Sequence, residues 1–403
     1  MRAAVPTLLV TVVGKDRPGV TSAVFTALSV HGVEVLDIEQ VVLRQRLVLG
    51  VLVTVPRDEA VLRHALGQVA DDLAMDVDVE RGTGDNQSRR DGRSHVTVLG
   101  RPLRPGAVSA IAGRIADSGA NIDRIVRMAR YPVTAIEMDV SGTSPELLRT
   151  LLSAEAALQH VDVAVQPAGL LRHGRKLIVM DVDSTLVQGE VIELLAAHAG
   201  SADRVAELTD RTMRGELDFA ESLRERVGTM AGLDADALDA IYAELQLAPG
   251  ARTLVRTLKR LGYLFAIVSG GFSQITDRIA AELDIDYAQA NELEIVDGRL
   301  SGRILGQVVD RAGKAAALKQ FAQDSGIALS HTVAIGDGAN DLDMLAAAGL
   351  GVAFNAKPVV RDAADASVSV PYLDTICYLL GITREEIEAA DADAGFATPA
   401  PPI

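Results

Sequence analysis

Tryptophan is absent from this 403-residue chain, cysteine occurs once, and aromatic residues make up only 3% of the sequence. The single Cys377 excludes an internal disulfide and a cysteine-rich metal site, and it fits a reducing compartment such as the cytoplasm. Hydrophobic residues still reach 48%, so a large core must be built from alanine, valine, leucine and isoleucine. We therefore expect a cytoplasmic protein whose stability rests on aliphatic packing.

Long apolar runs are also missing. The first apolar segment, Leu8–Val13, is far shorter than the ~20 residues of a membrane-spanning helix, and Lys15 and Asp16 follow it in place of a signal-peptide cleavage site. The formal net charge of −16 argues against binding to nucleic acid or to an anionic membrane surface. Neither nucleic acid nor a membrane is therefore expected as a partner.

Two polar segments divide the chain. Residues 82–94 and 167–175 contain many loop-forming residues and lack apolar periodicity. The length of the chain is enough for about three domains. The predicted divisions are 1–81, 95–166 and 175–388, followed by a tail, 389–403, whose composition predicts disorder.

The first two divisions repeat each other. A Pro-Gly turn ending in Gly19 or Gly106 precedes a helical stretch in each copy, and apolar segments that fit strands surround it. The predicted order is strand, helix, strand, strand, helix, strand, which is a ferredoxin-like α+β arrangement. The expected elements are strands 8–13, 35–38 and 47–55 with helix 21–30, and strands 95–99, 122–125 and 135–140 with helix 109–117.

These two segments resemble ACT domains, which are small regulatory modules that bind amino acids. The resemblance implies a ligand near Gly19 and Gly106, where backbone amides at a helix N-terminus suit a carboxylate, and Asn121 could bind the amino-acid head group. It also implies pairing of these modules, and hence a homodimer. The alternative, that both glycines only make tight turns, remains open.

Two carboxylates follow an apolar run in the third division. Residues 177–180 form a predicted buried strand, and Asp181 and Asp183 come directly after it. Both acids should lie at the carboxyl edge of a sheet, where their charges repel unless a cation or a proton intervenes. This pattern predicts a metal-assisted site with one nucleophilic acid and one proton carrier. The alternative is an ordinary strand-to-turn junction at Asp183 and Ser184.

Three further places carry polar groups suited to phosphate or a metal. Ser269, Gly270 and Gly271 follow a predicted strand and offer a hydroxyl and free amides, although a plain turn with a serine cap is the alternative. Lys314 precedes an alanine-rich helix and in isolation would be a solvated lysine. The segment Gly336–Asp341 has two acids and an asparagine on a glycine-rich turn, which suits a hard cation.

From residue 176 onward, apolar strands alternate with helical stretches, which predicts a doubly wound parallel sheet. The long gap after the first strand contains several helices, more than a crossover needs. We therefore expect an insert at about 188–248 that covers the strand ends as a cap. The predicted strands are 176–180, 264–268, 333–335, 351–354 and 366–370, and the helices of the gap are 191–199, 202–213, 219–227, 235–245 and 250–261.

The order of these motifs resembles the haloacid dehalogenase-like (HAD) phosphohydrolases over residues 175–385. The likeness is greatest to their phosphoserine phosphatases, because the acidic motif reads Asp-x-Asp-Ser-Thr, Glu190 follows it, and the later motifs read Ser-Gly-Gly-Phe and Gly-Asp-Gly-Ala-Asn-Asp. The resemblance implies that Asp181 attacks phosphorus and that Asp183 is the general acid and base. It also implies a Mg²⁺ ion held by Asp181, the backbone carbonyl of Asp183 and Asp337.

The resemblance assigns the remaining residues too. Ser269, Gly270, Gly271, Lys314 and Asn340 would bind the phosphoryl group, with Thr185 and Asp341 in support. In the cap, Glu190 and Arg226 would bind the ammonium and carboxylate of the substrate, and Met213 and Phe219 would form an apolar wall. Each cap residue has an ordinary alternative: Glu190 as a first-turn acid, Arg226 as a solvated residue, and the other two as core.

The implied activity is Mg²⁺-dependent hydrolysis of O-phosphoserine, the last step of L-serine biosynthesis, with serine or another amino acid as effector. Two alternatives remain: a phosphatase for another small phosphomonoester, and an amino-acid sensor with a catalytically silent phosphatase-like domain. The four acids at 181, 183, 337 and 341 speak against a silent site. Transfer to an alcohol in place of water is also open.

Overall fold

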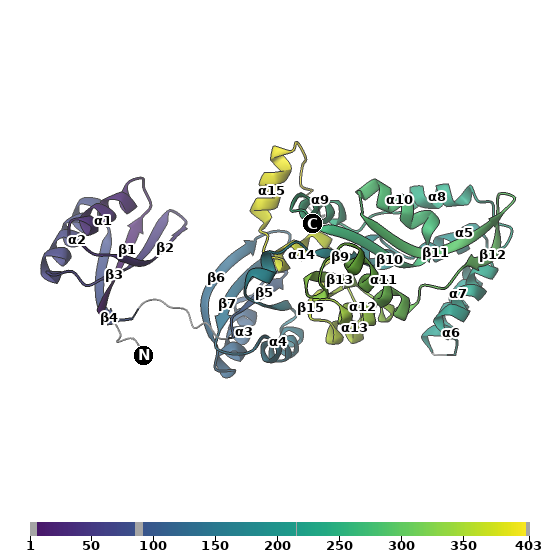
Figure 1. Ribbon diagram of the computed structural model, residues 1–403, viewed down its shortest axis with the longest axis horizontal. Coiled ribbons are helices and arrows are strands. Elements are labelled where there is room, and N and C mark those ends of the chain that lie inside the picture. Colours follow the sequence, from purple (N-terminus) through teal and green to yellow (C-terminus); the bar gives the residue numbers. More distant parts are fainter. Residues whose placement is uncertain (1–5, 85–91, 215, 400–403) are drawn as a thin grey trace. The chain divides into compact units, whose positions relative to one another are not determined.

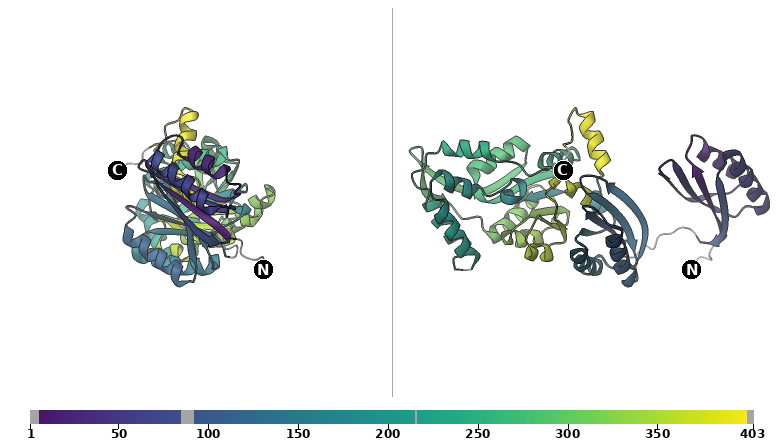
Figure 2. Two further views of the ribbon diagram at one scale, coloured as in Figure 1. Left: turned by 90° about the vertical axis from the view of Figure 1, so that its left-hand side faces the viewer. Right: turned by 180° about the vertical axis from the view of Figure 1, so that it is seen from behind.

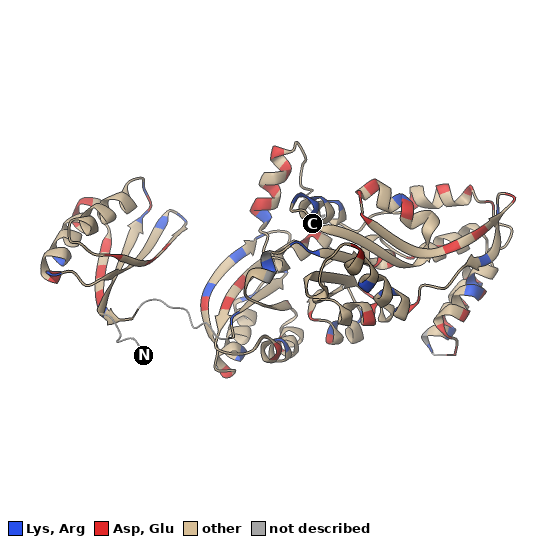
Figure 3. Cartoon of the chain, in the orientation of Figure 1, with Lys and Arg blue, Asp and Glu red and all other residues tan. Residues whose placement is uncertain are grey.

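The computed structural model describes residues 6–84, 92–214 and 216–399. The chain forms two compact units, Met1–Arg90 and Asp91–Ile403, and each is described by itself (Figure 1). Asp and Glu residues occur on many helices and strands (Figure 3). Among the described residues, no helix combines the length and the apolar character needed to cross a membrane.

The first unit is a four-stranded antiparallel sheet with two helices on one face. Its elements are β1 (Pro6–Lys15), α1 (Val20–Ser29), β2 (Val35–Leu43), β3 (Arg46–Thr54), α2 (Glu59–Leu73) and β4 (Asp76–Thr83), in the sheet order β2-β3-β1-β4. Alternate residues of β1 (Leu8, Val10 and Val12) are fully buried, because every second side chain of a strand points toward the helices. The ferredoxin-like order predicted for this segment is confirmed.

The second unit begins with the same arrangement. Its elements are β5 (Ser94–Gly100), α3 (Pro105–Asp117), β6 (Asn121–Ala129), β7 (Thr134–Ser141), α4 (Pro145–Gln159) and β8 (Asp162–Pro167), and the strands are ordered β8-β5-β7-β6. Buried Ile111 and Ile115 of α3 and Leu148 and Leu152 of α4 pack against this sheet. The predicted repeat is therefore a repeat of structure as well as of sequence.

A parallel sheet follows in the same unit. Its central strands are β9 (Leu177–Met180), β10 (Leu264–Phe272), β13 (Thr332–Gly336), β14 (Leu350–Phe354) and β15 (Ala366–Val368), in the order β10-β9-β13-β14-β15. Strand β9 is buried throughout, because helices cover both faces of a doubly wound sheet. The main helices around this sheet are α9 (Ala251–Arg260), α10 (Ser273–Leu283), α11 (Arg311–Asp324), α12 (Leu342–Ala347) and α13 (Pro358–Ala363).

The sequence prediction missed a hairpin at the edge of this sheet. Strand β11 (Tyr287–Val296) pairs in parallel with β10, and β12 (Arg299–Leu305) returns antiparallel to it. The hairpin contacts the cap, because backbone hydrogen bonds join Gly232 to Leu300 and Ala235 to Gly298. It therefore supports the insert from one side.

The cap consists of α5 (Val191–His198), α6 (Ala202–Met213), α7 (Phe219–Gly228) and α8 (Ala237–Glu244). The two chain segments that connect it to the sheet lie side by side, since Gln188 N donates to Gln246 O (2.8 Å) and Ala248 N donates to Leu186 O (2.8 Å). The insert thus leaves and re-enters the sheet at one place. This position agrees with the cap that we expected at about 188–248.

The two sheets of the second unit are continuous, which the sequence did not indicate. Strand β8 pairs antiparallel with β15 through Ala164 and Ala366, so that eleven described strands form one sheet. The rear view in Figure 2 shows this sheet running through the unit. The second ferredoxin-like segment is therefore built into the edge of the larger α/β sheet.

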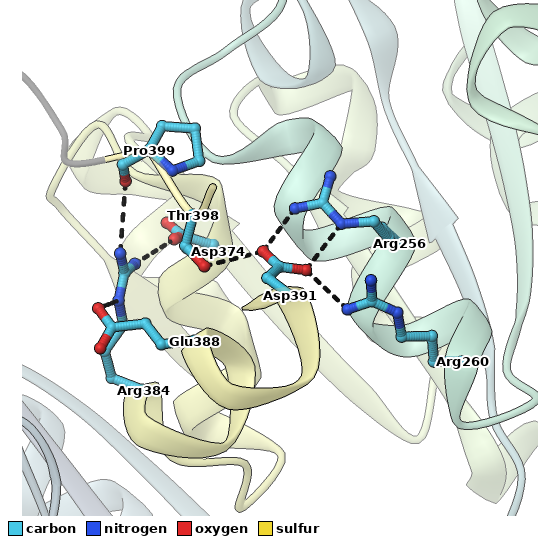
Figure 4. A network of polar contacts seen from close by, with 8 residues as sticks. All are labelled: Arg256, Arg260, Asp374, Arg384, Glu388, Asp391, Thr398 and Pro399. Atoms are coloured by element: carbon cyan, nitrogen blue, oxygen red, sulfur yellow. Dashed lines mark hydrogen bonds and ion pairs between the residues drawn. The ribbon is translucent and has the colours of Figure 1, made fainter. Parts of the chain in front are cut away.

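The tail that we expected to be disordered from residue 389 is ordered through most of its length. Helix α15 (Arg384–Asp393) continues past 389, and Asp391 is buried between Arg256 and Arg260 of α9 (Figure 4). Thr398 donates to Asp391, and the Phe396 ring lies under the Arg256 guanidinium. This charge network holds a polar segment that composition alone marks as disordered. Residues 400–403 lie outside the described part.

Candidate active site

The acid at the end of β9 is held by a buried lysine. Lys314 Nζ lies 2.6 Å from Asp181 Oδ1 and 2.7 Å from Asp341 Oδ1, and its side chain is 1% exposed. Val182 N also donates to Asp181 Oδ1. Since neither contact uses Asp181 Oδ2 and the side chain lines a cavity, this second oxygen is available for chemistry.

Asp183 is fixed by two donors of different kinds. Its Oδ1 accepts from Val191 N at the start of α5 (2.8 Å), and its Oδ2 accepts from the Ser269 hydroxyl (2.9 Å). Gly271 lies against these groups, and a Cβ there would fall 2.8 Å from Asp183 Oδ2. The glycine is therefore required for the close approach of the end of β10 to Asp183.

The Gly336–Asp341 turn brings two more acids to the same place. Asp337 accepts from the Thr185 hydroxyl (3.1 Å), and Asp341 also accepts from Gly338 N (3.0 Å). Carboxylate oxygens of Asp181, Asp337 and Asp341 lie within 4.8 Å of one another. Three acids with one lysine leave an excess of negative charge, and oxygen ligands of this kind suit Mg²⁺. The residues present therefore fit a divalent cation.

Burial governs the electrostatics of this cluster. Burial, followed by repulsion from Asp341, raises the pKa of both Asp181 and Asp337. Burial also raises the pKa of Asp183, although hydrogen bonds from Val191 N and Ser269 oppose it. Burial would lower the pKa of Lys314, but Asp181 and Asp341 outweigh it and raise that pKa. The site thus holds a permanent cation beside acids that ionise reluctantly.

The cavity above these acids has a volume of about 430 Å³, and residues of α6 and α7 in the cap line part of it. Glu190 and Arg226 both line it, as do Phe219, Gly270, Gly271 and Asn340. Partial burial, together with repulsion from Asp183, raises the pKa of Glu190 to about 7. Burial lowers the pKa of Arg226, against the opposing effect of Glu190 and Glu193. Arg226 is only 9% exposed, so it is not the solvated residue of the alternative interpretation.

The side chain of Met213 lies outside the described part of the chain, and its backbone ends α6. Phe219 is the first residue of α7, and its ring approaches Gly270, where a Cβ would fall 3.0 Å from Phe219 Cζ. Phe219 is therefore placed at the wall of the cavity, as expected.

Several residues of the site were not singled out from the sequence. Buried Asn291 on β11 donates to Gly270 O and accepts from Val309 N, so it fixes the irregular last part of β10. Lys357, Glu193 and Thr212 line the cavity. No motif marks these positions, because they reach the site from elements far apart in the sequence.

The residues predicted for an effector are placed differently from one another. Gly19 has a left-handed φ of 96° and caps α1, whereas Gly106 is an exposed residue in the first turn of α3. Gly106 therefore lies within a helix and does not make the tight turn of the alternative interpretation. The side chain of Asn121 donates to Asp123 at the start of β6. The site that they form with an amino acid remains a prediction.

Three family models match separate parts of the chain. Residues 178–346 match the haloacid dehalogenase-like hydrolase model, and residues 6–80 and 93–166 each match an ACT domain model. A solved structure, the unliganded probable phosphoserine phosphatase from Vibrio cholerae, is 34% identical with a TM-score of 0.58, over 74% of this chain and 88% of that one.

Curated relatives match almost the whole chain. The phosphoserine phosphatase of Streptomyces coelicolor is 61% identical, and that of Mycobacterium tuberculosis is 54% identical, each over 96% of this chain and 95% of the relative. A shorter match is the phosphoserine phosphatase of Saccharomyces cerevisiae, 38% identical over 72% of this chain and 95% of the relative. The chain therefore belongs to the phosphoserine phosphatases of the haloacid dehalogenase-like hydrolase family, with two ACT domains ahead of the catalytic domain.

Proposed function

We propose that the enzyme hydrolyses O-phospho-L-serine to L-serine and phosphate through a phosphorylated Asp181. The observation that carries this proposal is the arrangement of the Asp181 carboxylate. Lys314 and Val182 N hold Asp181 Oδ1, whereas Asp181 Oδ2 makes neither contact. The side chain lines a cavity that is large enough for a small phosphomonoester. A nucleophile fixed in this way is oriented for attack before the substrate arrives.

The proposed hydrolysis has two steps. Asp181 Oδ2 forms a bond to phosphorus while the bond from phosphorus to the seryl oxygen breaks, and Asp183 gives that oxygen a proton. Water then attacks the phosphorus of the acyl phosphate, Asp183 takes a proton from it, and the Asp181–phosphorus bond breaks to release phosphate. The raised pKa of Asp183 suits this exchange of a proton.

Asp181, Asp337 and the backbone carbonyl of Asp183 would hold a Mg²⁺ ion in this site. The ion would supply positive charge that offsets the repulsion between a carboxylate and an anionic phosphate. Lys314, Asn340 and the amides of Gly270 and Gly271 are proposed to bind the phosphoryl oxygens. Asp341 positions Lys314, and Thr185 orients Asp337. Ser269 bonds to Asp183 here and is proposed to turn its hydroxyl toward phosphate when substrate binds.

Glu190 and Arg226 are proposed to select a zwitterionic substrate. Both line the cavity, one from the start of α5 and one from α7, with opposite charges. The seryl ammonium would pair with Glu190 and the carboxylate with Arg226, and burial of the guanidinium makes such a pair stronger than a solvated one. Phe219 at the start of α7 is proposed to exclude water from the cavity, together with Met213 at the end of α6.

The proposed place of this reaction is the last step of L-serine biosynthesis, with feedback by serine through the ACT domains. We also propose a homodimer. In the first unit, the sheet face opposite α1 and α2 exposes Leu9 and Val48, which are 39% and 37% exposed. Apolar side chains on an open sheet face favour association with a second copy.

A panel of phosphomonoesters tests the proposed activity. Phosphate release is measured for O-phosphoserine, O-phosphothreonine, phosphoethanolamine and an aryl phosphate, with Mg²⁺ and with EDTA. We expect O-phosphoserine to have the highest kcat/KM and EDTA to abolish release. Equal rates for phosphoethanolamine, which lacks the carboxylate, would contradict the role of Arg226.

A further inference from the structure

The junction between the second ACT domain and the catalytic domain is held by a polar clamp. Asp162, the first residue of β8, accepts from Ser369 N (2.8 Å) and from the hydroxyls of Ser369 (2.8 Å) and Ser367 (3.2 Å). Arg149 of α4 pairs with Asp365 at 2.9 Å. These contacts, together with the pairing of β8 and β15, join the two domains into one body at this seam.

A cavity of about 630 Å³ lies along this seam, between α4 and α13. Figure 1 shows both helices below the joined sheet. The residues that α4 presents to the cavity include Ser153, Ala154 and Ala157, whose small side chains cannot fill the space toward α13. The volume is in the range of known small-molecule sites, ~300–1,000 Å³.

The seam cavity offers charges of both signs. Arg101, Arg361 and Asp362 line it, along with His160. Arg101 is held by a hydrogen bond to Tyr372 Oη (2.9 Å), whereas Arg361 and Asp362 make no side-chain hydrogen bond or ion pair within the described part of the chain. The Asp162 carboxylate already accepts hydrogen bonds from Ser367 and Ser369. The Arg361 charge is attracted by the nearby Asp162 carboxylate, but no described residue makes a side-chain hydrogen bond to Arg361 or Asp362. A guanidinium and a carboxylate with free hydrogen-bonding groups at one cavity suit a ligand that carries both an anionic and a cationic group.

Helix α13 connects this cavity to the active site. Its N-cap, Lys357, lines the catalytic cavity, and Arg361 and Asp362 near its other end line the seam cavity. The loop before α13 is also tied to the seam strand, because Asn355 N donates to Val368 O of β15 (2.7 Å). Lys357 directly precedes this six-residue helix, so a displacement of α13 at Arg361 can reach Lys357 through one short element.

We propose that the seam cavity is an effector site for a free α-amino acid, and that α13 transmits its occupancy to Lys357 in the active site. The ligand carboxylate binds to Arg361 and Arg101, and its ammonium binds to Asp362. This site differs from the Gly19 and Gly106 positions expected from the ACT resemblance. The transmitted effect rests on the proposed hydrolysis of O-phosphoserine, whereas binding itself does not.

Amide hydrogen exchange of the full chain tests the binding. The probe is an equimolar mixture of the proteinogenic α-amino acids, followed by L-serine alone, with succinate as a dicarboxylate that lacks the ammonium. At about ten times the dissociation constant, exchange of amides in residues 153–162 should slow about tenfold. The double variant Arg361→Ala/Asp362→Ala should lose this protection, and Val359→Ala, an exposed residue of α13 outside the cavity lining, should keep it.

A cavity-filling variant tests the same site independently, in case the double variant does not fold. Ala157→Phe should block protection, while Leu158→Phe, at a residue of α4 that is 70% exposed and outside the lining, should not. No protection by the amino-acid mixture, or protection that survives both cavity variants, overturns the site. Equal protection by succinate overturns the zwitterionic class.

Enzyme rates test the transmission separately. Phosphate release is measured at saturating O-phosphoserine, where competition by product at the active site disappears, with and without the protecting amino acid. We expect the amino acid to change the rate of the parent enzyme and of Val359→Ala, and to leave the rate of Arg361→Ala/Asp362→Ala unchanged. An unchanged rate in the parent overturns the transmission through α13. A parent enzyme that releases no phosphate from O-phosphoserine even without the amino acid would contradict the proposed function instead.

Discussion

Replacement of Lys314 by methionine removes the cation that contacts both Asp181 and Asp341. The Lys314 side chain is 1% exposed, and its Nζ lies 2.6 and 2.7 Å from the two carboxylates. A cation from the solvent therefore cannot take the place of the lost ammonium group. Methionine has a similar volume and flexible stem, and it therefore keeps the packing of α11 while deleting the charge.

The expected loss follows from these contacts. Deleting one preorganised donor at a developing charge costs a factor of about 10²–10³ in kcat, or ~3–4 kcal/mol. Since Lys314 also orients the nucleophile, we expect the upper part of this range. Removal of one partner from a buried ion pair also destabilises a fold by ~3–5 kcal/mol, so the melting temperature should fall.

Steady-state phosphate release with O-phosphoserine measures the effect, and Lys319→Met is the matched control. Lys319 lies on the same helix and is exposed, so its replacement should leave kcat within about twofold of the parent. Circular dichroism confirms that each variant is folded at the assay temperature. A Lys314→Met enzyme with nearly full kcat, or equal losses in both variants, would refute the reasoning.

Three further predictions concern the cap, the metal and the C-terminal helix. Arg226→Ala should raise KM for O-phosphoserine by a factor of ~10–100 and spare an aryl phosphate, whereas exposed Arg224→Ala should change neither, because only Arg226 lines the cavity. EDTA should abolish phosphate release and added Mg²⁺ should restore it; activity in EDTA would contradict the metal assignment. Burial would raise the pKa of Asp391, but hydrogen bonds from Arg256 and Arg260 outweigh it and lower that pKa to about 2. Asp391→Asn should therefore lower the melting temperature at neutral pH, unlike exposed Asp393→Asn.

The sign of the pH effect at Asp391 follows from its lowered pKa. The folded state holds this proton less tightly than the unfolded chain, so ionised Asp391 stabilises the fold above pH ~4 by roughly 2.5 kcal/mol. This contribution is lost as the pH falls from about 4 through about 2. The difference in melting temperature between the parent and Asp391→Asn should narrow over that window, and a difference that stays constant would contradict the charge network of Figure 4.

The sequence predicted the site better than it predicted its surroundings. Asp181 and Asp337 each follow a short apolar strand, and Ser269 lies near the carboxyl end of β10. Parallel strands bring their carboxyl ends to one edge, so local patterns were enough to bring these residues together. Asn291 follows no such rule. It lies within β11, the inner strand of the hairpin, whose partly exposed side chains hide its periodicity, and its role depends on Gly270 and Val309.

The joined sheet and the ordered tail depend on contacts that no local pattern contains. A single residue pair, Ala164 and Ala366, connects the two sheets, and Asp162 stabilises it through serines about 200 positions later. The helix that ends the chain is polar and would be marginal alone. It is ordered because Asp391 pairs with two arginines of α9.

The central claim is that the phosphoryl group passes through Asp181. Radiolabelled O-phosphoserine is mixed with excess enzyme, the reaction is quenched in acid within milliseconds, and the labelled peptides are mapped. The account predicts label on the peptide that contains Asp181, its disappearance as free phosphate forms, and no label in Asp181→Asn. Release of phosphate without a labelled peptide, or label on another residue such as Ser269, would contradict it.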